Sequence, residues 1–328
     1  MPSLFLIVCY EPLLTHTFHE QPMANYSTEN AGIVLATTRS AYDLQKLRIQ
    51  TGNRIVANFR DKLGMDAGEP DDDAAQELMA DLRKRYRRIT DGIARVTRRP
   101  SYDYDGVITT YAEIALLDYY FSLAKREQSL FTALGDALKK CPIWNEFLDD
   151  VHGVGPAMGG VIVSEMDPHR AKHPSSFWSY AGLDVADDGR GRSRREAHLV
   201  EHTYTDSEGN EQTRKGISFN PFLKTKLIGV LGPSFLRARS DDAYYQDVYY
   251  RYRHRIENRD DLQDESDGHL HNMAIRYMVK DFLIDLHIIW RDLEDLPVSK
   301  PYHVAKLGKD DHDRERRLGV HNPKRHGD

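Results

Sequence analysis

The 328-residue sequence has only two cysteines, no long apolar run and none of the common nucleotide, esterase or redox motifs. Cys9 and Cys141 are too few for a disulfide framework or a four-cysteine zinc site, and they suit a reducing compartment. No apolar stretch approaches the ~20 residues of a membrane span, so we expect a cytoplasmic protein without a membrane partner. A glycine-rich nucleotide loop, a Gly-x-Ser-x-Gly turn and a Cys-x-x-Cys pair are all missing, which disfavours nucleotide hydrolysis, ester hydrolysis and thiol redox chemistry.

The charge balance also lacks an excess of basic residues. Lysine and arginine number 45 against 51 aspartates and glutamates, which gives a net charge of −6. A nucleic-acid surface, if present, is therefore expected as a local patch. Hydrophobic residues make up 40% and charged residues 29% of the chain, which predicts a globular protein with a sizeable core.

The two ends of the sequence carry little periodic signal. Residues 1–38 form a poorly defined start, in which the apolar run 3–8 lacks a preceding basic residue and is interrupted at Glu11. That pattern favours a short strand over a signal peptide. Residues 297–328 are charged and without apolar period, which predicts a disordered tail.

Residues 39–141 predict three long helices separated by polar breaks. The first ends near Gly64, before the acidic stretch 68–73, and the second ends at Pro100. The third has a near-heptad register with one polar gap at Glu127, typical of a coiled-coil-like seam or a helical hairpin. Packing within one chain and a homo-oligomer seam fit this register equally well. The apolar positions are Leu44, Leu47, Ile55 and Phe59, then Leu78, Leu82, Tyr86, Ile89 and Ile93, then Leu116, Tyr120, Leu123, Leu130, Leu134 and Leu138.

Residues 142–296 form a second region, in which glycine and basic residues become frequent. The stretch 197–217 predicts a β-hairpin around the glycine turn 206–210. Helices are expected again from about Pro221 and Asp241, and from about His269 to Leu293. The fold class is therefore mainly α: a long helical hairpin or coiled-coil region, followed by a helix-hairpin-helix domain with a small β-hairpin insertion.

The helix-hairpin-helix prediction rests on the glycine-rich stretch 149–163. Gly153 and Gly155 permit a tight turn and close approach, so that amides at the start of the second helix can face a phosphate. Val154 is expected to anchor the turn in the core, and Gly159 and Gly160 to let the helices pack closely. Such a motif contacts the nucleic-acid backbone without reading sequence. The alternative is a tight interhelical turn without a ligand.

Four arginines fall within six positions after this motif. Arg190, Arg192, Arg194 and Arg195 alternate with glycine and serine, which predicts a flexible cationic loop suited to phosphate. A solvated loop without a ligand is the alternative. Because the loop follows the glycine-rich turn, we favour nucleic-acid binding.

Several motifs in this region together resemble one family. They are Gly-Val-Gly-Pro at 153–156, Ser-Glu-Met-Asp at 164–167, the stretch 177–183 ending in Tyr-Ala-Gly-Leu, Ser-Phe-Asn-Pro-Phe-Leu-Lys at 218–224 and His-Asn-Met-Ala-Ile-Arg at 271–276. In this order they are similar to the carboxy-terminal domain of the IS-one-ten (IS116/IS902 type) insertion-sequence transposases. The likeness spans roughly residues 142–293.

The resemblance implies DNA as partner and DNA transposition, a form of recombination, as function, with a guide RNA as a further candidate partner. It places Lys224 and Lys226 in a basic DNA-binding segment. It also implies a nuclease domain with acidic metal ligands, which the sequence does not display: Glu11 stands where an aspartate is expected, and Asp71 to Asp73 lie in a predicted loop. We therefore assign no metal site. A divalent metal enters only if a nuclease domain is supplied elsewhere.

A catalytic serine is also implied by the resemblance. The family has Ser-Gly a few residues after Tyr-Ala-Gly-Leu, where this sequence has 187–190 without serine, so Ser193 is the nearest candidate. Neighbouring arginines could stabilise its anion and receive a phosphate. The alternative is a serine that only separates arginines. For the whole chain, the alternatives to a transposase are a non-catalytic nucleic-acid-binding protein lacking the nuclease half and a helical interaction scaffold.

Two weaker patterns favour structural roles. Tyr245, Tyr249 and Tyr252 share a helix face, which predicts core packing more than base stacking. His198 and His202 are expected on the same side of one strand. A solvent-exposed strand face is a better interpretation than a zinc site, because no cysteine accompanies the two histidines.

Overall fold

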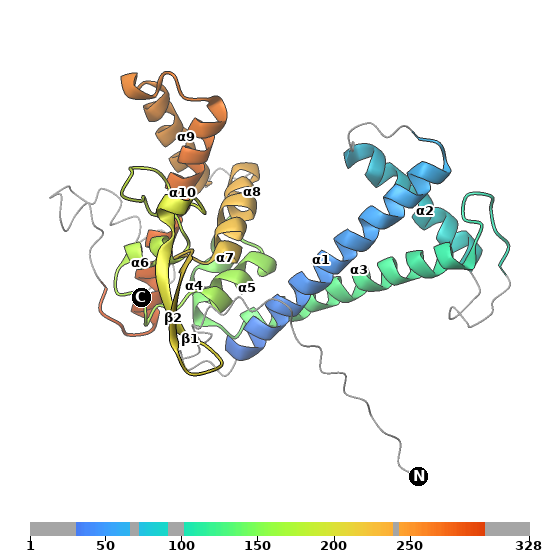
Figure 1. Cartoon of the computed structure of the whole chain (residues 1–328), viewed down its shortest axis with the longest axis horizontal. Coiled ribbons are helices and arrows are strands. Elements are labelled where there is room, and N and C mark those ends of the chain that lie inside the picture. Colours follow the sequence, from blue (N-terminus) through green and yellow to red (C-terminus); the bar gives the residue numbers. More distant parts are fainter. Residues whose placement is uncertain (1–30, 66–71, 91–101, 239–242, 299–328) are drawn as a thin grey trace, which may run out of the picture.

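The computed structural model describes residues 31–65, 72–90, 102–238 and 243–298. This part of the chain is mainly helical and has one two-stranded antiparallel sheet, as the sequence predicts. A long helical arm extends from a more compact body (Figure 1). The predicted amino-terminal strand, Asp71, Ile93 and the predicted disordered tail from residue 299 lie outside the described residues.

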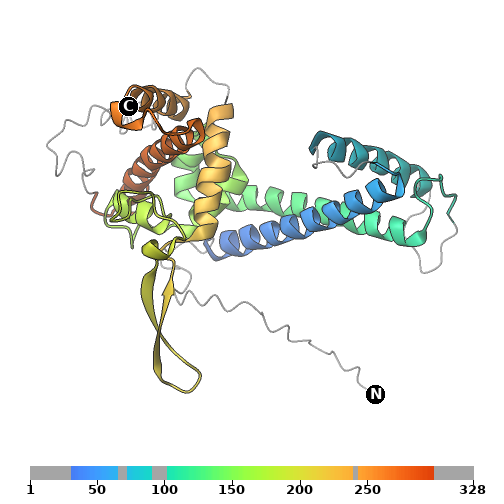
Figure 2. The same ribbon diagram turned by 45° about the horizontal axis from the view of Figure 1, so that its top comes forward.

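The arm consists of the three predicted helices. Helices α1 (Ala31–Lys62) and α3 (Tyr111–Leu138) run antiparallel along its length, and α2 (Asp72–Thr90) crosses their far end (Figures 1 and 2). The expected start near residue 39 is wrong, because α1 begins at Ala31. Ala31 and Val34 lie in the added stretch 31–38 and are buried in the core of the body.

Glu127 explains the polar gap in the register of α3. Its side chain is buried between α1 and α3, where it forms an ion pair with Arg48 and accepts a hydrogen bond from Gln45 Nε2 at 3.2 Å. The packing of α1 on α3 is therefore intramolecular. A buried ion pair adds little net stability, because its desolvation offsets the attraction.

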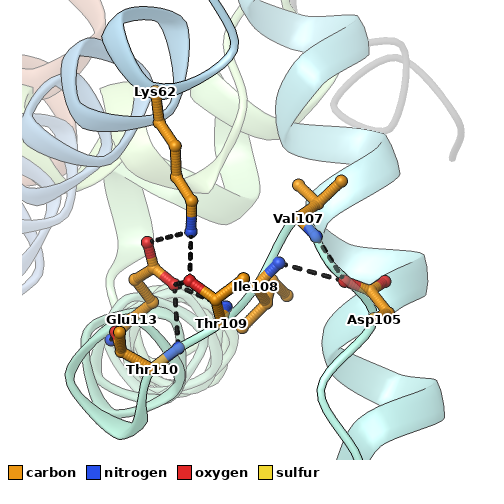
Figure 3. Close-up of polar contacts among 7 residues, drawn as sticks. All are labelled: Lys62, Asp105, Val107, Ile108, Thr109, Thr110 and Glu113. Carbon is orange, nitrogen blue, oxygen red and sulfur yellow. Dashed lines mark hydrogen bonds and ion pairs between the residues drawn. The ribbon is translucent and has the colours of Figure 1, made fainter.

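The start of α3 is fixed by a capping box (Figure 3). Thr110 Oγ1 accepts from the amide of Glu113, and the Glu113 carboxylate accepts from the amide of Thr110 in return. Lys62, at the end of α1, reaches the same carboxylate at 2.6 Å and Thr109 Oγ1 at 2.7 Å. These contacts join the end of α1 to the start of α3.

The body surrounds α10 (Asp267–Leu293), which has buried side chains along most of its length. The other helices are α4 (Pro142–Glu146), α5 (Pro156–Glu165), α6 (Pro174–Tyr180), α7 (Pro221–Lys226), α8 (Gly232–Arg237) and α9 (Tyr244–Glu257). A π-helical segment (Leu227–Leu231) joins α7 to α8. Pro233 lacks an N–H and stands just after this segment, which accounts for the interrupted hydrogen-bond pattern.

The predicted β-hairpin is confirmed. Strand β1 (Val200–Thr205) pairs antiparallel with β2 (Glu211–Gly216) through a turn in which Gly209 has φ +88°. The ribbon is largely exposed and projects from the body (Figure 2). The expectation that His198 and His202 share one strand is wrong, because His198 lies in a 3₁₀ turn (Glu196–His198) before β1 and its ring points into a polar network described below.

The described residues contain two apolar cores. The larger lies in the body and the smaller at the tip of the arm. Leu134 and Leu138, from the end of α3, belong to the larger core, so the end of the arm is packed into the body. Tyr245 and Tyr249 are buried there, which confirms their predicted structural role.

Candidate nucleic-acid interface

The glycine turn predicted as a helix-hairpin-helix is packed against α8. Gly153 has φ +99°, and a Cβ there would stand 2.9 Å from the ring of Phe235. Ser234 Oγ donates to the carbonyl of Gly153 at 2.8 Å. Val154 is buried, as predicted. Before the turn, however, the structure has only the short α4 and a 3₁₀ turn (Leu148–Asp150) where the pattern predicts a helix.

Gly159 and Gly160 allow α5 to contact its neighbours closely, as predicted. A Cβ on Gly159 would stand 2.2 Å from the ring of Trp144, and one on Gly160 would stand 2.6 Å from Leu134 and Thr38. Both glycines are therefore packing positions without access to a phosphate. Of the predicted contacts in this stretch, Gly155 is exposed and Gly153 is partly exposed.

Three of the family-like motifs meet at one buried carboxylate. Glu165, at the end of α5, forms an ion pair with Arg39 of α1 and accepts from Asn220 Nδ2 at 2.7 Å. Asn220 also caps α7 and donates to the hydroxyl of Tyr180 at 3.1 Å. This network joins α1, α5, α6 and α7, and it sets the position of α7 and therefore of Lys224.

The arginine-rich loop has a defined shape. Val185 and Gly191 form an isolated β-bridge, and the amide of Arg190 donates to Asp188 at 2.9 Å. Arg192 Nε donates to Asp184 at 2.7 Å. Arg190, Arg194 and Arg195 are exposed, as a phosphate-contacting loop requires.

Four cations gather where this loop meets α7 and α10. We call Arg192, Lys224, Arg276 and Lys280 the cation cluster. Lys224 Nζ donates to the carbonyl of Arg192, and Arg276 lies over Gly191, where a Cβ would stand 1.3 Å from its Nη1. The carboxylate of Asp184 acts on the charges of Lys224, Arg276 and Lys280, and it raises the pKa of each.

The cations of the cluster are partly removed from water and repel one another. Burial, with the nearby charge of Arg276, lowers the pKa of Lys224 to about 8. Burial also lowers the pKa of Arg276 and, together with the charge of Arg276, that of Lys280. Cations held in this way are stabilised by a bound anion, and phosphate is the anion that several converging basic side chains recognise.

Aromatic rings support the lysines of the cluster. Lys224 Nζ lies 4.5 Å from the ring centroid of Phe219, and Lys280 Nζ lies 5.3 Å from that of Trp178. Trp178 Nε1 also donates to the carbonyl of Lys280 at 3.3 Å. Phe219 and Trp178 therefore hold the ammonium groups close to the loop.

Lys226 lies apart from this cluster, although the sequence groups it with Lys224. Its Nζ stands 3.7 Å from the ring centroid of Tyr42, on α1, and burial lowers its pKa. Burial also raises the pKa of Tyr42 to about 12. Lys226 thus packs between α7 and the arm.

Ser193 is next to the cluster and has polar partners on both sides. Its Oγ lies 2.9 Å from His198 Nδ1 and accepts from the amide of Arg195 at 3.3 Å. His198 Nε2 lies 3.0 Å from Asp188 Oδ2. The candidate serine is therefore one member of a hydrogen-bonded series of three side chains.

Sequence reasoning missed the contributions of Asp184, Arg276 and Lys280, and it treated His198 only as a metal candidate. One signal was available: Arg276 and Lys280 are four residues apart on a predicted helix, which places them on one face. The meeting of α10 with the loop near residue 190 had no local signal, because about 85 residues separate the two.

The metal set that the resemblance implies does not fit this part of the chain. Among the described residues, no three His, Cys, Asp or Glu side chains gather as a metal site would require. We therefore derive no step through a metal ion.

Comparison with known proteins supports the family likeness. Residues 145–204 match the Transposase IS116/IS110/IS902 family. The match supports the resemblance that the motifs indicated, and the matched part contains the glycine turn, the arginine-rich loop and Ser193. Lys224, Arg276 and Lys280 lie beyond the match. No curated protein and no solved structure matches the chain. None of the helices in the described segments is long and apolar enough to span a membrane.

Proposed function

We propose that the chain is a cytoplasmic, transposase-like protein that binds DNA by its backbone phosphates and takes part in the transposition of an insertion sequence. One observation carries the proposal. The cation cluster brings partly buried basic groups together around Asp184, directly beside the arginine-rich loop of the segment that matches the transposase family. Such an arrangement suits phosphate and does not select bases.

The exposed arginines extend this surface. Arg190, Arg194 and Arg195 lie on the same loop as Arg192, so a strand bound at the cluster would meet several cations in succession. A local patch of this kind agrees with a chain whose net charge is −6. Gly155, which is exposed at the start of α5, remains a further predicted contact.

Ser193 stays the candidate nucleophile for strand cleavage and transfer. The competing function is nucleic-acid binding without catalysis, in a protein that lacks the nuclease half. A strand-transfer assay on element-end DNA separates the two, because Ser193→Ala abolishes transfer by an enzyme and changes nothing in a binding protein. A third function, a helical interaction scaffold, predicts no nucleic-acid affinity at all.

The nucleic acid that accompanies the native protein tests the proposal. The full chain is purified from its own cells without nuclease, and the attached nucleic acid is sequenced. DNA from repeated element ends, or a discrete RNA of the guide type, would support a transposase. Random fragments released by ~0.5 M salt would indicate a backbone-binding protein without transposition. Protein free of nucleic acid would contradict the proposal and favour the scaffold. The mass of the purified particle also tests the predicted homo-oligomer.

A further inference from the structure

We propose that His198 and Asp188 form a proton relay that activates Ser193 as a nucleophile. The phosphodiester named below as its target rests on the proposed function. The family-like motifs pointed to a serine but supplied no base for it, and residues 187–190, the stretch in which the family has Ser-Gly, contain no serine. In this chain, Asp188 is linked to Ser193 through the ring of His198.

The three side chains form a continuous series. Ser193 Oγ lies 2.9 Å from His198 Nδ1, and His198 Nε2 lies 3.0 Å from Asp188 Oδ2. Both distances lie in the range expected for a nucleophile, its base and the group that orients the base. All three side chains come from the eleven residues 188–198, so no domain movement is needed to assemble the series.

The hydrogen-bond pattern fixes which nitrogen of His198 carries the proton. The amide of Ser193 donates to Nδ1 at 3.0 Å, so Nδ1 must offer its lone pair. The proton of the neutral ring is then on Nε2, which donates to Asp188. The hydroxyl of Ser193, 2.9 Å from Nδ1, shares this lone pair with the amide, and this is the tautomer that a general base requires.

The surroundings of the relay suit proton transfer. The His198 side chain is only 1% exposed, whereas Asp188 is 40% exposed. The hydrogen bond from His198, with a second one from the amide of Arg190, lowers the pKa of Asp188, so its carboxylate is charged at neutral pH. The charged Asp188 stabilises the imidazolium that forms when His198 takes a proton.

The oxygen of Ser193 has a hydrogen-bond donor that can stabilise its anion, and it lies beside the cation cluster that would bind the substrate phosphate. The amide of Arg195 donates to Ser193 Oγ at 3.3 Å, and this hydrogen bond stabilises the negative charge that develops on Oγ as the hydroxyl loses its proton. Arg192, the preceding residue, belongs to the cation cluster, and its carbonyl binds Lys224. A phosphate held by the cluster would therefore lie next to the serine.

The chemical step is a phosphoryl transfer. Ser193 Oγ attacks the phosphorus of a DNA phosphodiester, and its proton passes to His198 Nδ1. A bond between Oγ and phosphorus forms while one bond from phosphorus to a deoxyribose oxygen breaks. The leaving oxygen takes the proton from His198, which restores the neutral ring. The strand remains joined to Ser193 as a phosphodiester, so the reverse step can join it to a second end.

A purely structural clamp is the competing explanation of the same contacts. A clamp needs only an acceptor for the amide of Ser193 and a donor for Asp188, and a glutamine can supply both. A base must in addition accept a proton and release it again, which glutamine cannot do. His198→Gln therefore separates the two explanations while it preserves the fold.

An alkyl fluorophosphonate tests the relay without DNA. Such a probe phosphonylates an activated serine: the bond from Oγ to phosphorus forms, fluoride leaves and the serine proton goes to the base. The full chain is incubated with the probe, and the labelled peptide is identified by mass spectrometry. We expect labelling at Ser193, none in Ser193→Ala, and no change in Ser179→Ala, which removes an exposed serine of α6.

Variants of the relay have graded effects. His198→Gln lowers the labelling rate by about 100-fold or more, the usual contribution of a general base. Asp188→Asn lowers the rate roughly tenfold, whereas Asp188→Glu, which keeps the carboxylate, restores much of it. Circular dichroism shows whether each variant is folded.

The outcomes distinguish the relay from the proposed function. A folded His198→Gln variant that is labelled like the parent, or a parent chain that is not labelled at Ser193, would overturn the relay. In either case, duplex binding by the cation cluster would persist. Labelling that depends on His198 in a chain without affinity for DNA would leave the relay standing and contradict the proposed function instead.

Discussion

The guanidinium of Arg276 lies against Gly191, at a distance that leaves no room for a Cβ on residue 191. Through this contact, α10 and the arginine-rich loop approach each other, although they are far apart in the sequence. The contact holds Arg276 near Lys224, whose pKa it lowers, and next to the segment that carries Ser193. The position of Arg276 in the candidate interface therefore depends on a glycine at residue 191.

Gly191→Ala should displace Arg276 and weaken DNA binding. The new methyl group would overlap Nη1, so the guanidinium must leave its place, and we expect DNA affinity to fall roughly tenfold, the order of one charged contact. Fluorescence anisotropy with a labelled duplex measures the effect. Gly229→Ala is a matched control, because no atom lies within 4 Å of its Cβ position. Equal affinity of the Gly191→Ala variant and the parent would show that Arg276 makes no contact with DNA.

DNA affinity should fall as pH rises above 8. Lys224 has a pKa of about 8 in the free protein, so it is largely charged at pH 7 and largely neutral at pH 9. Phosphate favours the charged form, and binding at pH 9 must therefore include uptake of a proton, at a cost of about tenfold in affinity. Lys224→Gln should remove this difference between pH 7 and pH 9. A pH-independent affinity in the parent chain would place Lys224 outside the interface.

The buried His287 should make the fold sensitive to acid. Burial, with the charge of Arg291, lowers its pKa from 6.5 to about 4, although a hydrogen bond to the carbonyl of Ala171 opposes the shift. Between pH 6.5 and 4 the unfolded chain binds a proton that the folded chain does not, so stability falls as pH falls through this window. Between pH 7 and 5 the expected loss is about 2 kcal/mol.

Chemical denaturation at pH 7 and pH 5 measures this loss. His287→Gln keeps a donor for the carbonyl of Ala171 and has no titrating group at this position, so its stability should decrease by about 2 kcal/mol less than that of the parent. An identical pH dependence of the two proteins would exclude His287 as the acid-sensitive group.

Substitutions in the glycine turn should separate packing from binding. Gly159→Ala places a methyl group 2.2 Å from the ring of Trp144 and should destabilise the fold by about 1–3 kcal/mol or more, as overpacking does. Gly155→Ala has no atom within 4 Å and φ −99°, so it should leave stability nearly unchanged. Thermal unfolding of the two variants provides the comparison. Equal melting temperatures would contradict the close packing of α5 on α4.

Local patterns were sufficient to predict most of the elements. The apolar period of α3 predicts a helix, and the glycine turn predicts the β-hairpin, each from residues that are close together in the sequence. The start of α1 was not predictable in this way, because Ala31 and Val34 give a weak period and contribute by contacting the distant body. In the sequence, Glu127 interrupts the apolar register of α3, and only the structure shows that Arg48 of α1 pairs with it.

The candidate site was predictable only in its contiguous part. The arginines and Ser193 follow one another in the sequence, and so they were recognised as a loop suited to phosphate. The cluster needs Lys224 and Arg276 from separate helices, and the relay needs the ring of His198 to turn away from β1 toward Asp188. The cluster and the relay both depend on contacts between segments whose relative positions cannot be predicted from local sequence periodicity.

The salt dependence of duplex binding tests the central claim most directly. Each phosphate contact contributes about −0.9 to the slope of log affinity against log salt for duplex DNA. The double variant Arg276→Gln with Lys280→Gln should reduce the size of that slope by about two contacts. The control, Lys125→Gln with Arg126→Gln on the exposed face of α3, should leave it unchanged. Equal slopes for the cluster variant and the parent chain would contradict phosphate binding by the cation cluster.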